Sequence, residues 1–149
     1  MSAWVNKMLV AYDGSAPSHK ALELARSIAE QNPQAEILFV HIVPIIGMGT
    51  GAEGALMQEA TEVLHEMEDL AAEMPNAARA RLLKGASASA ASMIIKCAKD
   101  EGCDLIIMGS RGQGGVKGYL GSVSYAVVQG SPVAVLIAKD TPEQKKANA

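Results

Sequence analysis

The chain has 149 residues, of which 49% are hydrophobic and 19% are charged. This composition is typical of a soluble globular domain and excludes a disordered chain. The net charge of −3 comes without a basic block, so general nucleic-acid binding is not expected. No apolar run reaches the roughly 18 residues that cross a bilayer, so we expect no membrane insertion.

We expect a cytoplasmic protein. The first residues lack the apolar h-region of a signal peptide, and Cys97 and Cys103 suit reduced thiols. The chain shows no internal repeat or linker. We therefore predict one domain over residues 1–149, with an ordered core at about 5–138 and a polar C-terminal tail at 139–149.

Apolar runs alternate along the chain with segments in which apolar residues recur every three to four positions. The runs predict buried strands and the recurring segments predict amphipathic helices. This alternation predicts an α/β fold with a parallel sheet covered by helices on both faces. The strands are expected at 8–12, 37–43, 77–84, 104–108 and 133–138, and the helices at about 15–32, 56–74, 87–101 and 122–129.

Several residues indicate where these elements begin and end. Ser15 is a candidate N-cap with Pro17 in the first helical turn, and Gly102 suits the position after a helix. Residues 47–54 contain four glycines and are predicted to form a mobile loop that acts at most as a lid.

Six of the 14 glycines lie between Gly109 and Gly121, after the fourth strand and before the last helix. Glycine lets the backbone approach a ligand closely, and successive amides at a helix N-terminus bind anions. Arg111 and Lys117 add positive charge, so the segment predicts a cradle for phosphate groups. The alternative is a flexible surface loop without a ligand.

The known phosphate-binding fingerprints do not match this segment. A P-loop requires a Gly-Lys pair, which the chain lacks. The dinucleotide fingerprint would need a glycine where Lys117 stands, and it belongs to a first strand rather than a fourth. If a nucleotide binds here, it does so by another arrangement.

Asp13 follows the first strand and is the candidate acid of the site. In open α/β sheets ligands bind beyond the carboxyl ends of strands, where the strand order reverses. If the first and fourth strands flank this point, Asp13 faces the glycine segment and can accept a hydrogen bond from a base or ribose. Alternatively, its side chain only forms an Asx-turn before Gly14 and Ser15.

No residue pattern indicates a catalytic centre or a metal site. His41 lies in an apolar strand and is expected to be a core histidine with a satisfied ring, while His19 and His65 lie on helices. Ser110 and Ser122 have no evident activating base. We expect no catalytic residue and no protein-held metal, although Mg²⁺ can enter with bound phosphates.

Four segments of the chain together resemble one known family. They are Val-Ala-Tyr-Asp-Gly-Ser at 10–15, Phe-Val-His-Ile-Val at 39–43, Asp-Leu-Ile-Ile-Met-Gly-Ser-Arg-Gly at 104–112 and Gly-Ser-Val-Ser at 121–124. Over residues 5–138 the chain resembles the universal stress proteins. The resemblance implies a Rossmann-like sheet of the adenine nucleotide alpha hydrolase type, with five parallel strands in the order 3-2-1-4-5. It also implies a homodimer formed through the last strand, at 133–138.

The ATP-binding branch of that family carries the pattern Gly-x2-Gly-x9-Gly-Ser/Thr. In this chain eight residues rather than nine separate Gly112 from Gly121, and the extra glycines between them could absorb the difference. The resemblance implies ATP as the ligand, with Mg²⁺ accompanying it. The implied contacts are Asp13 and the backbone near Ile42 for adenine, Gly109, Arg111 and Gly112 for ribose and inner phosphates, and Gly121, Ser122 and, as a weaker addition, Ser124 for outer phosphates.

The resemblance implies a stress-response regulatory protein in which bound ATP switches a homodimer and the surface it shows to a regulatory protein partner. The apolar last strand supports the dimer independently, because an exposed apolar edge needs a cover. Such a protein is not an enzyme, or is at most a slow ATPase. The alternatives are a slow adenosine-nucleotide hydrolase or adenylating enzyme, and a dimeric scaffold without ligand.

Overall fold

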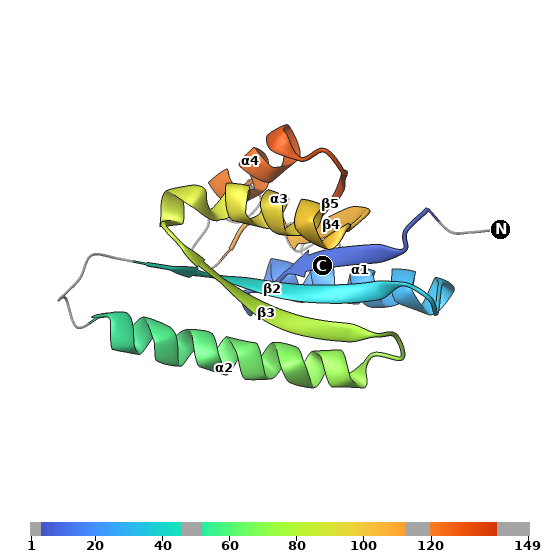
Figure 1. Cartoon of the computed structure of the whole chain (residues 1–149), viewed down its shortest axis with the longest axis horizontal. Helices are drawn as coiled ribbons and strands as arrows, with labels where there is room; N and C mark the ends of the chain where they lie inside the picture. The colour runs from blue at the N-terminus through green and yellow to red at the C-terminus, as the bar shows by residue number, and fades with distance from the viewer. Residues whose placement is uncertain (1–3, 46–51, 113–119, 140–149) are drawn as a thin grey trace, which may run out of the picture.

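A parallel sheet of five strands lies at the centre of the computed structural model, which describes residues 4–45, 52–112 and 120–139 (Figure 1). The strand order is β3-β2-β1-β4-β5, as the family resemblance implied, and the fold is Rossmann-like. The elements are β1 (Lys7–Ala11), α1 (Ala16–Gln31), β2 (Glu36–Pro44), α2 (Ala52–Glu73), β3 (Ala78–Gly85), the 3₁₀ turn η1 (Ser87–Ser89), α3 (Ala90–Glu101), β4 (Leu105–Gly109), α4 (Ser122–Gly130) and β5 (Ala134–Ala138).

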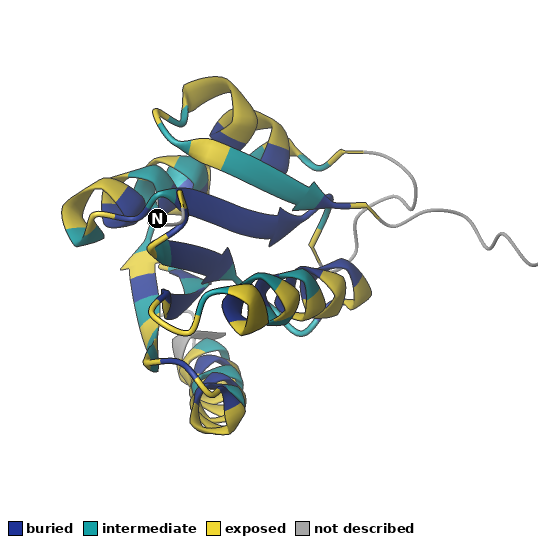
Figure 2. Cartoon of the chain, turned by 90° about the vertical axis from the view of Figure 1, so that its right-hand side faces the viewer, coloured by how far each residue is buried: buried dark blue, intermediate teal, exposed yellow. Residues whose placement is uncertain are grey.

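Helices cover both faces of the sheet, with α1 and α2 on one side and α3 and α4 on the other (Figure 1). Successive residues of β1 point to opposite faces, so that Met8 joins the core under α1 and α2 while Leu9 joins the core under α3 and α4. Both side chains are fully buried. The middle strands are accordingly the most buried part of the molecule (Figure 2).

The predicted ends of the first and third helices are confirmed. The Ser15 hydroxyl accepts a hydrogen bond from the Ser18 amide at 3.3 Å and so caps α1. Gly102 follows α3 with a φ of +72°, a left-handed conformation that favours glycine.

The loop predicted for residues 47–54 is wrong over its last three residues. Helix α2 begins at Ala52 and includes Gly54. A glycine within a helix costs about 1 kcal/mol relative to alanine, and the neighbouring alanines, leucine and glutamates favour the helix enough to offset this. The rest of that loop lies outside the described residues. The same holds for residues 113–119, which include Lys117, and for the predicted tail from residue 140.

Cys97, within α3, and Cys103, just after it, are both buried in the same core and unpaired. Burial raises the pKa of the Cys97 thiol, and it raises the pKa of the Cys103 thiol to about 11. Both side chains therefore stay protonated at neutral pH and serve as apolar core residues.

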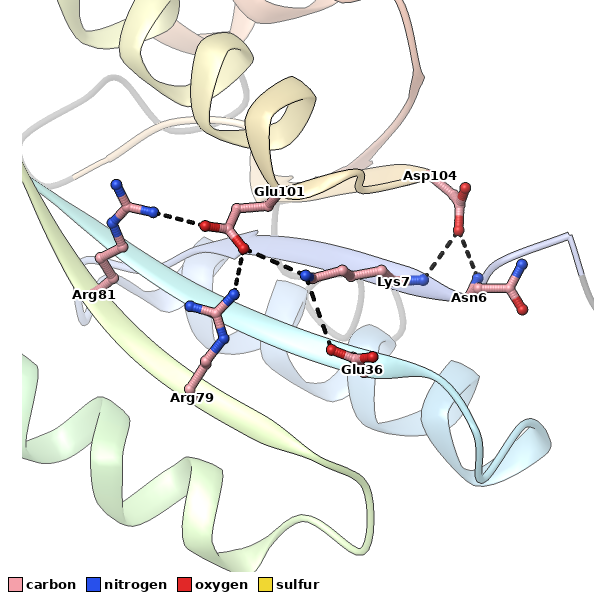
Figure 3. Close-up of polar contacts among 7 residues, drawn as sticks. All are labelled: Asn6, Lys7, Glu36, Arg79, Arg81, Glu101 and Asp104. Atoms are coloured by element: carbon pink, nitrogen blue, oxygen red, sulfur yellow. Dashed lines mark hydrogen bonds and ion pairs between the residues drawn. The ribbon is translucent and has the colours of Figure 1, made fainter.

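A cluster of charges ties four elements together at the amino-terminal edge of the sheet (Figure 3). The Glu101 carboxylate, at the end of α3, accepts hydrogen bonds from Lys7 Nζ at 3.3 Å, from Arg81 Nη1 at 2.9 Å and from Arg79. Lys7 Nζ also lies 3.9 Å from a Glu36 oxygen. These contacts fix the end of α3 to β1, β2 and β3 at the edge opposite Asp13.

We expect Glu101→Gln to lower the Tm at pH 7. The hydrogen bonds from Arg79 and then Lys7 hold the pKa of Glu101 below its ordinary value. A lowered folded-state pKa stabilises the protein above the unfolded pKa of about 4.3, and this contribution is lost as the pH falls through the folded value. The Tm difference between the variant and the wild type should therefore narrow between about pH 5 and pH 3. Glu30→Gln, on the exposed side of α1, is the control, and a difference that is constant with pH would contradict the assignment.

We expect Gly109→Ala to destabilise the fold by about 1–3 kcal/mol, because a β-carbon there overpacks the core. It would lie 2.5 Å from Pro17 Cβ and 2.8 Å from the Pro17 carbonyl carbon, in the first turn of α1. Gly54→Ala is the matched control, because its β-carbon meets nothing within 4 Å and should stabilise α2 by up to about 1 kcal/mol. Urea unfolding measures both, and equal effects would contradict the packing argument.

Candidate functional site

The carboxyl ends of β1 and β4 form the edge where the sequence placed the site. The two strands pair in parallel, with Met8 opposite Leu105 and Val10 opposite Ile107. From this edge β1 leads into α1 on one face, while the segment after β4 leads into α4 on the other face. The predicted reversal of strand order therefore lies between β1 and β4, which is the position where open α/β sheets bind ligands.

Asp13 is held in a fixed turn at this edge. Its Oδ1 atom accepts a hydrogen bond from the Ser15 amide at 2.9 Å, which is the Asx-turn that the sequence left open as an alternative. Its own amide donates to the Ser18 hydroxyl at 3.3 Å, and Gly14 takes a φ of +82° to complete the turn. The turn uses Asp13 Oδ1 and fixes the orientation of the side chain, so that Oδ2 is directed toward Gly112.

Asp13 faces the glycine segment across the edge of the sheet. A β-carbon built on Gly112 would lie 2.7 Å from Asp13 Oδ2, which is closer than real β-carbons approach other atoms. Because Gly112 has no side chain, its backbone can lie directly against the Asp13 carboxylate. The Arg111 guanidinium lies beside them and donates from Nη1 to the Gly112 carbonyl at 3.3 Å.

The start of α4 is fastened to the end of β4. The Gly121 amide donates to the Ser110 carbonyl at 2.6 Å, and the buried Ser124 hydroxyl donates to the Gly109 carbonyl at 2.8 Å. These two bonds bring the beginning and the end of the glycine segment together. The Ser124 hydroxyl thus holds α4 against the end of β4. The sequence did not indicate this contact.

The first turn of α4 offers backbone donors toward this edge. The first amide bonded within the helix is that of Tyr125, which donates to the Gly121 carbonyl at 2.9 Å. The three preceding amides, of residues 122–124, have no acceptor within the helix, and the N-cap Gly121 carries no side chain that could supply one. Ser122 is exposed at the first position of this turn. Together the amides and the hydroxyl suit an anion.

Ile42 lies on the neighbouring strand, level with Asp13. Ala11 pairs with Val40, and the Tyr12 amide continues this ladder by donating to the Val40 carbonyl at 2.9 Å. Two residues after Val40, the half-buried Ile42 lies within β2 near its carboxyl end. The structure therefore places Asp13 and Ile42 level with each other on neighbouring strands, and these are the two residues for which the family resemblance implied contacts with adenine.

The sequence did not indicate the part that Tyr12 plays beside Asp13. Its hydroxyl donates to the Glu66 carboxylate on α2, and its carbonyl lies 3.0 Å from His41 Nδ1. Burial first, and then the hydrogen bond to Glu66, raise the pKa of the Tyr12 phenol well above its ordinary value. His41 is half-buried rather than fully in the core, and its Nδ1 atom has the Tyr12 carbonyl as a polar partner.

Two hollows in the described residues are lined by side chains other than Asp13 and Gly112. One, of about 350 Å³, lies along α3 at Ser92, Ile95, Lys96, Lys99 and Asp100. The other, of about 220 Å³, lies at the carboxyl ends of β2 and β3 and is lined by Val43, Pro44, Ile45, Leu56, Met57 and Lys84. The second shares the sheet edge with Ile42, and the first lies on the outside of the molecule.

The described part of the chain shows neither a cluster of metal ligands nor a membrane span. Across residues 4–45, 52–112 and 120–139, no three His, Cys, Asp or Glu side chains gather as they would around a metal ion. Within the same ranges, no helix combines the length and hydropathy of a bilayer span.

Comparison with known proteins identifies the family. The model of the universal stress protein family matches residues 5–139. The universal stress protein YxiE of Bacillus subtilis is 35% identical over an aligned length of 150 residues, gaps included. The alignment covers 90% of this chain and 99% of YxiE.

Solved structures of that family share the fold. The universal stress protein from Archaeoglobus fulgidus in complex with dAMP matches with a TM-score of 0.72 and 20% identity, over 92% of this chain and 100% of that one. A universal stress protein in complex with cAMP matches with a TM-score of 0.63 and 22% identity, over 92% of this chain and 98% of that one. The sequence motifs, the strand order and the match over residues 5–139 agree, and the chain belongs to the universal stress protein family.

Proposed function

We propose that the chain binds an adenine nucleotide at the edge between β1 and β4 and acts as a ligand-dependent regulatory switch rather than as an enzyme. The observation that carries the proposal is the close approach of Gly112 to the Asp13 carboxylate. This approach places a hydrogen-bond acceptor, the Asp13 carboxylate, opposite the glycine segment, whose backbone amides and the first turn of α4 supply donors. Two family members of the same fold are complexes with dAMP and cAMP, which supports this class of ligand.

The charges of the site decide how the nucleotide lies. A carboxylate accepts hydrogen bonds and repels phosphate, so Asp13 must face the adenine amino group or the ribose hydroxyls. Phosphates would lie at the other end, against the amides of residues 122–124 and the Ser122 hydroxyl, with Arg111 adding positive charge. Ile42 would contribute its backbone and an apolar surface to the base.

The remaining proposed site residues act through the backbone. We assign to Gly109, Gly112 and Gly121 the close passage of the chain along the ribose and phosphates, and to Ser124 the fastening of α4 that holds its amides in place. ATP is the proposed ligand, with Mg²⁺ held by its phosphates and by water.

A direct hydrogen bond links the site to the last strand. The Ser110 amide, one residue after Gly109, donates to the Ala138 carbonyl at the end of β5 at 2.9 Å. A nucleotide that repositions residues 109–112 therefore acts on β5. If β5 pairs with its copy in a second subunit, binding changes the dimer surface that a regulatory partner meets.

The strand β5 supports the dimer proposal. It is the outer strand of the sheet, and Val135, Leu136 and Ile137 are only partly buried although they are apolar (Figure 2). Two large apolar side chains on the adjacent helix α4, Tyr125 and Val128, are 56% and 46% exposed. An apolar edge of this kind is stabilised by pairing with a second copy.

The nucleotide proposal predicts that Asp13→Ala weakens adenine nucleotide binding about 10- to 100-fold, because one hydrogen bond to a charged group is worth about 1.5–3 kcal/mol. Gly112→Ala should weaken it to a similar degree by displacing the carboxylate. Calorimetry with AMP, ADP and ATP, each with and without Mg²⁺, measures both effects. Asp100→Asn, an exposed acid on α3, is the control.

Each outcome of that titration bears on a different part of the proposal. If the wild-type chain binds none of the three nucleotides, the proposed function is wrong and the dimeric scaffold without ligand is the remaining alternative. If AMP binds more tightly than ATP, the proposed site stands but ATP is not its preferred ligand. Rapid release of phosphate from ATP would identify a hydrolase and overturn the assignment as a switch.

The dimer proposal predicts that Val135→Lys converts the protein to a monomer, because a charge on β5 opposes pairing with a second copy. Sedimentation velocity on the wild type should give twice the mass of the chain. Met57→Lys, an equivalent change at a partly exposed position on α2, should leave that mass unchanged. Circular dichroism shows whether both variants fold, and a folded dimeric Val135→Lys would contradict the proposal.

A further inference from the structure

Tyr12 occupies a position at which one side chain meets three elements. It follows β1, directly before Asp13, and is only 2% exposed. Its hydroxyl donates to Glu66 on α2 and lies 3.1 Å from His19 Nε2 on α1. The two rings of Tyr12 and His19 also pack edge to face, with centroids 5.3 Å apart at 84°. A single buried phenol therefore connects both helices of this face to the end of β1.

The backbone of Tyr12 is fixed as firmly as its side chain. Its amide donates to the Val40 carbonyl at 2.9 Å, and its carbonyl lies 3.0 Å from His41 Nδ1, both on β2. Residue 12 thus cannot shift without disturbing β2, α1 or α2. Since Asp13 begins at the next peptide bond, the direction in which its side chain leaves the sheet is set by Tyr12.

The chemistry of the hydroxyl favours two partners at once. Burial and the neighbouring Glu66 carboxylate keep the phenol protonated, so it acts as a donor to Glu66. Its oxygen then accepts from His19 when Nε2 carries a proton. Glu66 Oε2 and His19 Nε2 lie 4.0 Å apart, and these two side chains are 46% and 53% exposed, respectively. The contacts with the helices therefore lie at the surface, where they can open without opening the core.

We propose that Tyr12 is a positioning residue that couples the packing of helix α2 to nucleotide binding through Asp13. This inference rests on the proposed function. In the coupled state the hydroxyl is bonded to Glu66, α2 is held against the end of β1, and Asp13 is aimed at the ligand. In the uncoupled state the bond is broken and Asp13 loses that support. Since coupling is reciprocal, nucleotide stabilises α2 as much as α2 favours nucleotide.

The test compares Tyr12→Phe with Thr61→Val. The first removes the hydroxyl and keeps the ring, while the second removes an exposed hydroxyl on α2 whose bond is to the Met57 carbonyl. We expect Tyr12→Phe to weaken binding of ATP with Mg²⁺, and of AMP, about tenfold, which corresponds to an ordinary allosteric coupling. We expect Thr61→Val to bind as the wild type does.

Hydrogen exchange distinguishes coupling from a merely structural hydroxyl. Addition of ATP with Mg²⁺ to the wild type should slow amide exchange in α2 around Glu66. In Tyr12→Phe saturated with the same nucleotide, this slowing should be absent. A hydroxyl that only stabilises the fold would change exchange equally with and without nucleotide, and this result would overturn the proposal.

Changes at Glu66 keep the test available if Tyr12→Phe folds poorly, because Glu66 is half-exposed. Glu66→Gln retains an acceptor oxygen and should restore most of the affinity, whereas Glu66→Ala should resemble Tyr12→Phe. The double variant Tyr12→Phe with Glu66→Ala should bind no more weakly than either single variant, since both remove one interaction. Glu62→Ala, one turn earlier and exposed, is the matched control.

The two proposals fail in different ways. A wild-type chain without affinity for any adenine nucleotide would overturn the proposed function and the coupling together. A wild type that binds nucleotide, with equal affinity and equal α2 exchange in Tyr12→Phe and Glu66→Ala, would overturn the coupling alone. Additive losses in the double variant would also contradict it, because they would show two independent effects.

Discussion

The two central strands of the sheet run side by side, yet the chain leaves them toward opposite faces. After β1 it turns to α1, and after β4 it passes toward α4, so the backbone diverges above the paired strands. Connections that leave in opposite directions mark the edge at which open α/β sheets bind ligands. The candidate site depends on this divergence, because the Asp13 carboxylate, after β1, lies close to Gly112, after β4.

The glycines of this region answer different physical demands, which the sequence could only present as one pattern. Gly109 lacks a side chain because the first turn of α1 lies against it, and Gly112 because the Asp13 carboxylate does. Gly121 donates its amide to Ser110 and begins α4 without a capping side chain. The demand at Gly109 would exist even in a protein that binds nothing, so the ligand contact proposed for Gly109 is additional to its packing role.

The elements and their order could be predicted from the sequence because they depend on local patterns. Apolar runs and helical repeats identify buried strands and amphipathic helices, and Gly102 ends α3 through its own backbone conformation. The start of α2 was misplaced because Gly54 suggested a loop, while its helix-forming neighbours determined the outcome. The fold was therefore predictable wherever a single residue or a short repeat decides the structure.

The candidate site was predictable only in part, because some of its residues act through distant partners. Asp13 and the glycines follow strands, and their shared edge follows from the strand order. The side-chain contacts of Tyr12 and Ser124 had no such signal. The first depends on Glu66, which is 54 residues away, and the second on the Gly109 carbonyl, which is 15 residues away. A pattern in the sequence does not encode such pairings.

The shielding of the two thiols has a consequence for a chain whose relatives are named for stress. Peroxide attacks the thiolate, and a thiol whose pKa is about 11, as at Cys103, is ionised in only about one molecule in ten thousand at pH 7. Cys97 is buried as well, and its pKa is also raised. Both thiols of the folded chain are therefore poor targets for peroxide, and the nucleotide response proposed above needs neither of them.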